Sequence, residues 1–162
     1  MGCGTGASFP YLVQAVGTAG EVVAVEISPA MARQARTRVE SHGWGNVRVL
    51  EDAAQTVQLA GQFDGVLLFA AHEVLTSPDA LDHLLASLQK DAHVVAFGAK
   101  RSSRHLGILF NPLLSFITHH LFPSSTAPID DQPWRLLEER LGELHKQEHA
   151  YGFMYLVWGS LT

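Results

Sequence analysis

Three glycines near the start of the sequence have the spacing of a loop that lets a ligand approach the backbone. Gly2, Gly4 and Gly6 alternate with Cys3 and Thr5, and an apolar stretch with helical spacing follows. With no side chains in the way, the backbone can pass close to a ligand while N–H groups of the next helix point outward. The loop predicts a nucleotide-type cofactor site, with a tight glycine turn without a ligand as the alternative.

A carboxylate follows the loop at a distance that suits recognition of a ribose. Glu26 lies in the apolar run 21–27, twenty residues after Gly6. At the end of a strand, a carboxylate can accept hydrogen bonds from both hydroxyls of a ribose. The loop and Glu26 together leave adenosylmethionine and NAD open as cofactors, and a surface glutamate at a strand end is the simpler alternative.

One histidine has the position of a general base. His72 follows the apolar run 63–69, where an open α/β sheet has the mouth of its pocket. A base is needed when the acceptor is an alcohol, a phenol or a carbon acid. A solvated or helix-capping histidine is the alternative. His119 and His120 do not predict a metal site, because adjacent helical residues point apart and no further ligand has suitable spacing.

Glycine turns, helical stretches and β-branched runs alternate over the first hundred residues. The pattern predicts helices over 8–16, 29–42 and 78–88, and strands over 21–27, 47–50, 63–69 and 93–98. Ser28-Pro29 is typical of an N-cap with proline in the first helical turn. The alternation predicts an α/β fold with a doubly wound, Rossmann-like and mostly parallel sheet.

The pattern changes from Arg101 onward. The predicted elements are two short helices within His105–Phe122, a connector over 123–133, a helix over 134–141, and strands over 144–149 and 153–160. The two final strands predict an antiparallel hairpin. The length suits one domain over 1–162, with a cofactor-binding half over 1–100 and lid helices and C-terminal strands over 101–162.

Composition narrows the classes of partner. The net charge of −5 argues against a nucleic-acid backbone as the main partner, because such proteins usually present a basic face. A single cysteine gives no internal disulfide, and no signal peptide is recognised, so a cytoplasmic location is expected. Lys100, Arg101 and Arg104 could meet an anionic headgroup, with a solvated basic turn as the blander interpretation.

Three stretches together resemble the successive motifs of class I S-adenosylmethionine-dependent methyltransferases. They are MGCGTG at 1–6, VVAVEISPAM at 22–31 and LEDA at 50–53, and the likeness extends over about the first hundred residues. Weaker similarities in the tail are to the bacterial branch that includes quinone-biosynthesis and phospholipid N-methyltransferases. The resemblance implies S-adenosylmethionine as the cofactor.

The resemblance also implies roles for individual residues. Glu26 would hold the ribose, and Asp52 would accept a hydrogen bond from the adenine amino group. Ile27, Met31 and Ala53 would pack on the adenine faces. The glycine loop would lie under the methionine moiety, and its residues are Gly2, Cys3, Gly4, Thr5 and Gly6. Asp52 is preferred to Glu51 because strand alternation places neighbours on opposite faces. The expected acceptor is a small molecule, with a lipid or quinone-like compound compatible with the apolar stretch 106–122.

The family's first strand should precede the glycine loop, and the chain begins at that loop. We therefore expect the first strand to be missing from the centre of the sheet, between the strands 21–27 and 63–69. The alternatives are direct pairing of those two strands and filling of the slot by a strand from another chain.

Two other functions compete with methyl transfer. An NAD-dependent oxidoreductase would share the loop and Glu26, but Asp52-Ala53 favours adenosylmethionine. A non-catalytic, degenerate paralogue would bind the cofactor without reaction. The stretch 106–122 is too interrupted for a convincing membrane span, so a lid, with at most peripheral membrane contact, is expected.

Overall fold

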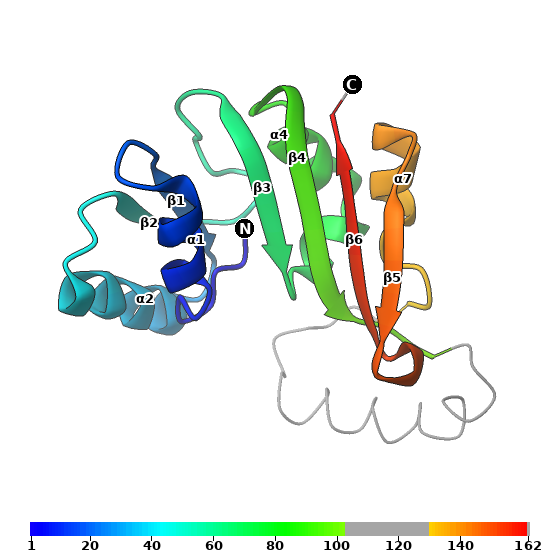
Figure 1. Cartoon of the computed structure of the whole chain (residues 1–162), viewed down its shortest axis with the longest axis horizontal. Coiled ribbons are helices and arrows are strands. Elements are labelled where there is room, and N and C mark those ends of the chain that lie inside the picture. Colours follow the sequence, from blue (N-terminus) through cyan, green and yellow to red (C-terminus); the bar gives the residue numbers. More distant parts are fainter. Residues whose placement is uncertain (103–129, 162) are drawn as a thin grey trace. The chain divides into compact units, whose positions relative to one another are not determined.

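The computed structural model describes residues 1–102 and 130–161, which fall into two compact units, Met1–Ala60 and Gly61–Thr162. Each unit has its own sheet (Figure 1). The single domain expected over 1–162 stays a prediction. The helices predicted within His105–Phe122 lie outside the described residues.

The first unit contains a βαβ arrangement that follows the glycine loop and helix α1 (Phe9–Val16). Strands β1 (Val22–Glu26) and β2 (Val47–Glu51) pair in parallel on either side of helix α2 (Pro29–His42) in the sequence. A small core unites the elements, because Phe9 packs with residues of both strands and of α2. Its buried members are Phe9, Val22, Ala24, Ala35 and Val47.

Local sequence signals explain both ends of α2. The Ser28 side chain accepts a hydrogen bond from the Met31 N–H, and Pro29 occupies the first turn. At the other end Gly43 has φ 65°, a left-handed conformation that ends a helix at little cost for glycine. The start and end predicted for this helix are confirmed.

The second unit contains the larger sheet, with strand order β3-β4-β6-β5. Its elements are β3 (Phe63–Phe69), α3 (His72–Thr76), α4 (Pro78–Leu85), β4 (Leu88–Ala99), α7 (Arg135–Leu141), β5 (His145–His149), the 3-10 turn η1 (Ala150–Gly152) and β6 (Met154–Ser160). β3 and β4 are parallel, whereas β6 is antiparallel to both β4 and β5. The predicted α/β fold with a C-terminal antiparallel hairpin is confirmed.

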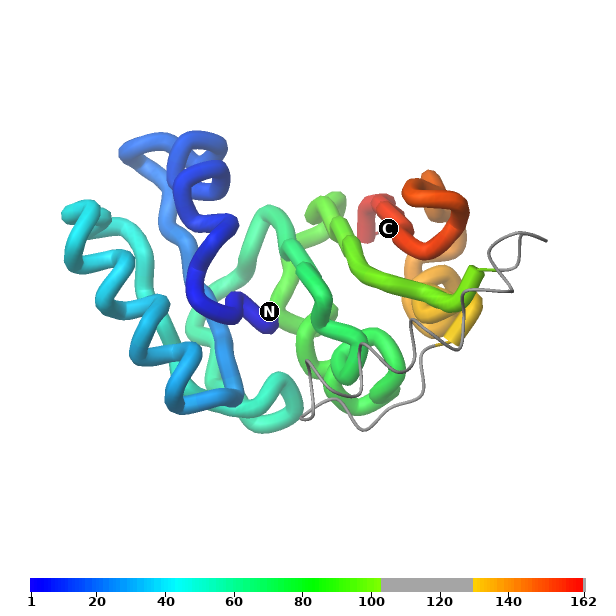
Figure 2. The backbone as a smooth tube through the Cα atoms, turned by 90° about the horizontal axis from the view of Figure 1, so that it is seen from below, coloured from blue at the N-terminus to red at the C-terminus, as the bar shows by residue number. Residues whose placement is uncertain are grey.

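The two faces of this sheet differ. Leu68, Ala96 and Val157 form one cross-strand row and are fully buried. Helices α3, α4 and α7 lie on one side of the sheet (Figure 2). Both α4 and α7 contain buried leucines. The neighbouring row, Phe69 and Phe97, faces the opposite way because successive residues of a strand alternate.

Some predicted bounds were wrong. The helix expected over 78–88 ends at Leu85, and the strand expected from 93 begins at Leu88. Leu88 is the ladder partner of Phe63, so pairing with β3 extends β4 into residues that have no strand pattern of their own. Helix α3 was not predicted, because five residues are too few to show a helical period.

Among the described residues, β1 pairs only with β2, and β3 only with β4. The missing first strand and the direct pairing of β1 with β3 both stay predictions.

Candidate functional site

The glycine loop has the backbone geometry that its sequence predicts. Gly2, Gly4 and Gly6 all have positive φ angles, of 65°, 55° and 76°, in a region that residues with side chains seldom adopt. A Cβ atom at Gly6 would collide with the ring of Phe9, whereas at Gly4 it would meet no heavy atom within 4 Å. The loop thus presents bare backbone beside open space at Gly4.

Hydrogen bonds fix this loop at the carboxyl end of β1. The Cys3 N–H donates to the Val25 carbonyl at 3.0 Å, and the Gly6 N–H donates to the Cys3 carbonyl at 3.0 Å. The loop is therefore anchored at the edge where ligands bind in open parallel sheets.

Glu26 is the centre of the polar contacts in this unit. Its side chain is buried, with 7% of the residue exposed. One carboxylate oxygen accepts the Gly4 N–H at 2.9 Å, and the other accepts the Ser28 N–H at 2.9 Å. The carboxylate thus links the glycine loop to the start of α2. A carboxylate has about four lone-pair positions, so two backbone donors leave acceptor capacity for ligand hydroxyls.

Two apolar side chains beside Glu26 are exposed. Ile27 follows it directly, and Met31 lies in the first turn of α2. Exposed large apolar groups next to a buried carboxylate are suited to contact a flat, weakly polar ring. This is the setting in which the resemblance would place an adenine.

Asp52 and Glu51 have different surroundings. One Asp52 oxygen accepts the Ala53 N–H and the Thr56 hydroxyl, each at 2.7 Å, and the Asp52 N–H donates to the Glu26 carbonyl at 3.2 Å. Glu51 instead forms an exposed ion pair with Arg36 at 2.9 Å. Asp52 is therefore fixed close to Glu26, whereas Glu51 is already engaged with Arg36.

The thiol in the loop is protonated at neutral pH. Burial, followed by the nearby charge of Glu26, raises the pKa of Cys3 to about 11. The thiolate is the reactive form of cysteine, so Cys3 is not a nucleophile under ordinary conditions.

His72 is the first residue of α3, directly after a tight turn that follows β3. Ala70 adopts a left-handed φ of 52°, and its N–H donates to the Phe97 carbonyl at 2.8 Å. The turn redirects the chain from the carboxyl end of β3 into the helix. His72 is half-buried there, and its carbonyl accepts the Thr76 hydroxyl at 2.9 Å.

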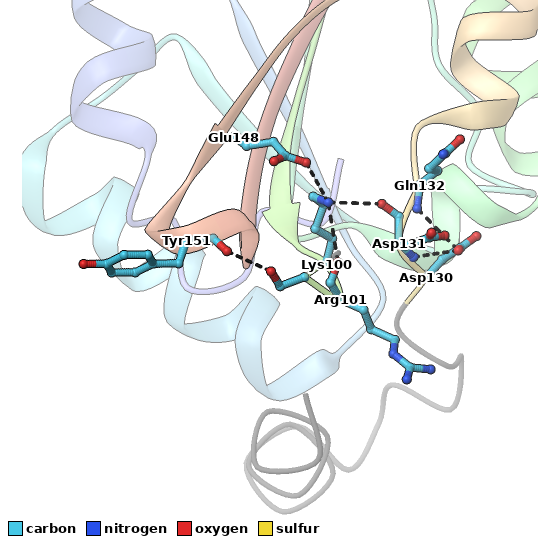
Figure 3. Close-up of polar contacts among 8 residues, drawn as sticks. Lys100, Arg101, Asp130, Asp131, Gln132, Glu148 and Tyr151 are labelled. Carbon is cyan, nitrogen blue, oxygen red and sulfur yellow. Dashed lines mark hydrogen bonds and ion pairs between the residues drawn. The ribbon is translucent and has the colours of Figure 1, made fainter. Parts of the chain in front are cut away.

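The surroundings of Lys100 differ from both expectations for the basic stretch after β4, a solvated turn or a contact with an anionic headgroup. Only 2% of its side chain is exposed, and its ammonium lies 2.7 Å from a carboxylate oxygen of Glu148, whose side chain is 31% exposed (Figure 3). The ammonium also donates to the carbonyls of Arg101 at 3.5 Å and Asp131 at 3.4 Å. It is therefore neither a solvated cation nor a group facing a lipid headgroup.

The backbone around Lys100 joins three segments. The Lys100 N–H donates to the Phe153 carbonyl at 2.9 Å, the Arg101 N–H donates to the Asp130 carbonyl at 3.0 Å, and the Ser102 hydroxyl donates to the Tyr151 carbonyl at 2.8 Å. Arg101 itself is exposed. Arg104, the third cation of the stretch, lies outside the described residues.

Neither metal ligation nor a membrane span is found in the part of the chain that the structure describes. No group of three or more His, Cys, Asp or Glu side chains there could hold a metal ion. No helix within 1–102 and 130–161 has the length and apolar character to cross a membrane.

Sequence comparison decides the family. The sequence pattern described as "Methyltransferase domain" matches residues 1–91, more than half of the chain. The chain belongs to this methyltransferase domain family. The class I S-adenosylmethionine-dependent family inferred from the glycine loop, Glu26 and Asp52 is thereby confirmed. A comparison with curated proteins gives no match.

Solved structures resemble the fold of this methyltransferase domain along nearly its whole length. A SAM-dependent methyltransferase from Aquifex aeolicus is 19% identical, with a TM-score of 0.71 over 99% of this chain and 79% of its own. The YcgJ protein of Bacillus subtilis is 12% identical, with a TM-score of 0.75 over 99% and 89%. The N-methyltransferase NodS from Bradyrhizobium japonicum, in complex with S-adenosyl-L-homocysteine, is 14% identical, with a TM-score of 0.69 over 99% and 74%.

Sequence reasoning missed the buried ion pair of this methyltransferase domain. Lys100 and Glu148 are 48 residues apart, and Glu148 lies in a strand whose residues are all exposed. The only sequence signal of the pair was a charged residue, Lys100, at the end of an apolar strand. That signal does not indicate which carboxylate neutralises the lysine.

Proposed function

We propose that this methyltransferase domain binds S-adenosylmethionine through the unit Met1–Ala60 and passes the methyl group, by in-line displacement, to a small lipophilic acceptor. The observation that carries the cofactor assignment is the position of Glu26. Its buried carboxylate joins Gly4 of the glycine loop to Ser28 of α2 and keeps acceptor capacity for a ribose.

The residues around Glu26 fit the rest of the cofactor. Open space beside the Gly4 backbone suits the methionine moiety. Exposed Ile27 and Met31 suit the faces of an adenine, and Asp52, held near Glu26 by a backbone hydrogen bond, suits the adenine amino group. Cys3 and Thr5 would contribute their backbone to the loop, and the protonated thiol of Cys3 carries no charge that could bind the cofactor. Ala53 would add a small apolar contact.

The protein's part in the reaction is mainly geometric. S-Adenosylmethionine supplies a methyl group that its sulfonium already activates. Alignment of reacting groups in a dry site can supply roughly 7 to 11 kcal/mol in favourable intramolecular cases. The glycine loop and Glu26 would hold one reactant in place. His72, half-buried after the carboxyl end of β3, would accept the proton of an alcohol, phenol or carbon-acid acceptor.

The proposed lipophilic character of the acceptor rests on the sequence. The stretch 106–122 contains ten large apolar residues: Leu106, Ile108, Leu109, Phe110, Leu113, Leu114, Phe116, Ile117, Leu121 and Phe122. An apolar excess of this kind needs a partner. Deletion of 105–122 should raise the KM for the acceptor far more than the KM for the cofactor, and equal effects would contradict a role in acceptor binding.

Calorimetry on the full chain tests the cofactor assignment. S-Adenosylmethionine and S-adenosyl-L-homocysteine should bind, and NAD should not. Glu26→Ala should weaken binding of S-adenosyl-L-homocysteine by about 10- to 150-fold, because even one hydrogen bond to a charged group contributes about 1.5 to 3 kcal/mol. Preferential NAD binding would instead favour an oxidoreductase.

Matched variants distinguish two effects of a substitution at Glu26, the loss of ligand contacts and the loss of support for the glycine loop. Glu21→Ala removes an exposed glutamate that pairs with Arg48 at 3.4 Å beside the same strand, and it should leave affinity unchanged. Glu26→Gln keeps the shape of the side chain and should fold normally by circular dichroism while still binding weakly. Unchanged affinity in both Glu26 variants would remove Glu26 from the site. Binding without turnover over a panel of acceptors would indicate a non-catalytic paralogue.

A further inference from the structure

Two phenylalanines stack on neighbouring parallel strands of the second unit. Phe69 is the last residue of β3 and the ladder partner of Phe97 in β4. Their ring centroids are 5.2 Å apart with an angle of 23° between the planes. Phe97 is half-buried, whereas 50% of Phe69 is exposed. The pair presents one aromatic face that is backed by a second ring.

The backbone fixes this pair at the strand ends. The Ala70 N–H donates to the Phe97 carbonyl at 2.8 Å, directly after Phe69. Ala70 then turns the chain with a left-handed φ of 52°, a conformation that carries strain in a residue other than glycine. Phe69 is thus held between a parallel ladder on one side and a hydrogen-bonded turn on the other. An aromatic ring fixed in this way loses little freedom when it binds a partner.

The exposure of Phe69 contrasts with that of its neighbour. Leu68, one residue earlier, is fully buried and points to the opposite face. A large apolar side chain left in water forgoes roughly 25 cal/mol for each Å² that it could bury. Ligands in open α/β sheets bind beyond the carboxyl ends of the strands, which is where this ring lies.

We propose that Phe69, backed by Phe97, is a specificity-determining residue that stacks on a planar aromatic ring of the methyl acceptor. The inference rests on the proposed function and narrows the acceptor from a lipophilic to a planar aromatic molecule. A flat ring in an offset stack gains contact with the whole exposed face of Phe69, together with the favourable arrangement of ring quadrupoles. A flexible aliphatic chain gains neither to the same degree.

Two probes with the same carbon skeleton, one aromatic and flat and the other saturated, test the proposal. 2-Naphthol is flat and aromatic, whereas trans-2-decalol has the same carbon skeleton and hydroxyl but is saturated. Dissociation constants of both are measured by ligand-observed NMR titration of the full chain. 2-Naphthol should bind more tightly. Phe69→Leu should weaken it about 2- to 10-fold, the contribution typical of an aromatic pair, and leave trans-2-decalol nearly unchanged.

Three further variants make the result specific. Phe69→Tyr keeps the ring and should retain affinity for 2-naphthol, whereas Phe97→Leu removes the backing ring and should weaken it less than Phe69→Leu. Trp158→Leu removes another exposed aromatic residue of the same sheet and should have no effect. Equal loss in Trp158→Leu, equal loss of both probes in Phe69→Leu, or no binding of 2-naphthol would overturn the proposal.

The cofactor measurement keeps the two proposals apart. S-Adenosyl-L-homocysteine is titrated into the same Phe69 variants, and its affinity should not change. If the unmodified chain failed to bind it while 2-naphthol discrimination persisted, the proposed function would be wrong and the aromatic site would stand. The reverse result would leave the cofactor assignment and remove the role of Phe69.

Discussion

Among the described residues, each unit buries one charged side chain near the end of a strand, a carboxylate in the first and an ammonium in the second. Glu26 accepts two backbone N–H groups, at 2.9 Å each. The Lys100 ammonium meets a carboxylate and two carbonyls, at 2.7, 3.5 and 3.4 Å. An ammonium has three hydrogens and a carboxylate about four lone pairs. Lys100 is therefore saturated by the protein, whereas Glu26 keeps capacity for a ligand.

This difference in remaining hydrogen-bonding capacity suggests a ligand-binding role for Glu26 and a structural role for Lys100. A buried charge whose partners are all internal stabilises the fold or fixes its geometry, and a buried charge with remaining capacity is prepared for a ligand. Substitutions around Glu26 should therefore change ligand affinity, and substitutions around Lys100 should change stability. The predictions below test this separation, beginning with the largest expected effect.

Loss of His72 should affect the rate and not cofactor binding. His72→Gln removes the proposed base, and removal of such a group typically lowers kcat by about 100- to 10,000-fold when the acceptor must lose a proton. The affinity for S-adenosyl-L-homocysteine should stay within about twofold, since the cofactor contacts proposed above all come from Met1–Ala60. Steady-state kinetics and calorimetry give both numbers.

His83→Gln provides the control, because His83 also lies on a helix of the second unit. A normal kcat in His72→Gln would remove the base from the mechanism. A parallel fall in cofactor affinity would contradict the separation of roles between the units.

Loss of the Lys100 charge should lower stability and leave affinity unchanged. Lys100→Met removes the ammonium that pairs with Glu148 and donates to two carbonyls. Breaking a fully buried pair costs about 3 to 5 kcal/mol, and the partial exposure of Glu148 reduces the expected loss to about 1 to 3 kcal/mol. Urea denaturation measures the change in the free energy of unfolding.

Lys146→Met is the matched variant for Lys100. Lys146 pairs with Glu138 at 2.6 Å, and both side chains are more than a third exposed. Its loss should change the free energy of unfolding by less than about 1 kcal/mol. If Lys100→Met instead weakened binding of S-adenosyl-L-homocysteine at unchanged stability, the structural role of Lys100 would be wrong.

Two adjacent acids sharpen the comparison within the first unit. Asp52→Asn should weaken binding of S-adenosyl-L-homocysteine about 5- to 20-fold, because it would change the one charge-assisted hydrogen bond proposed between Asp52 and the adenine amino group. Glu51→Ala should have no effect, since Glu51 pairs with Arg36 at the surface. Titration calorimetry of both variants decides, and loss of binding in Glu51→Ala alone would exchange the two roles.

The sequence predicts the first unit better than the second for a physical reason. The Ser28 cap, the turn at Gly43 and the glycine loop arise from contacts between residues close along the chain, which local residue types determine. The Glu26 bridge spans 22 residues, but its role follows from its place at a strand end. These residues alone predicted a nucleotide-type cofactor and left adenosylmethionine and NAD open, and the resemblance of the three motif stretches to methyltransferases favoured adenosylmethionine.

The second unit depends on partners that the sequence does not pair. The Lys100–Glu148 contact joins residues from β4 and β5, and the stack of Phe69 on Phe97 requires the register of β3 on β4. The early start of β4 at Leu88 likewise comes from its pairing with Phe63. Such contacts depend on strand order and register, which residue periodicity does not determine.

The smallest effect expected of a substitution concerns the reactivity of Cys3, which reports the charge of Glu26 from inside the loop. Burial and then Glu26 raise the pKa of the Cys3 thiol from 9.0 to about 11. Only the thiolate reacts with iodoacetamide, so alkylation at pH 8 should be on the order of 100-fold slower than for an ordinary exposed cysteine. The rate, followed by mass spectrometry, should keep rising until about pH 11. Between the unfolded and folded pKa values the folded chain holds the extra proton, so this thiol lowers stability as pH rises through that window. Glu26→Gln should lower the pKa of Cys3 and raise the alkylation rate at pH 8 severalfold, whereas Glu21→Gln should not. A rate that levels off near pH 9 in the unmodified chain would show that neither burial nor the Glu26 charge acts on the loop as described.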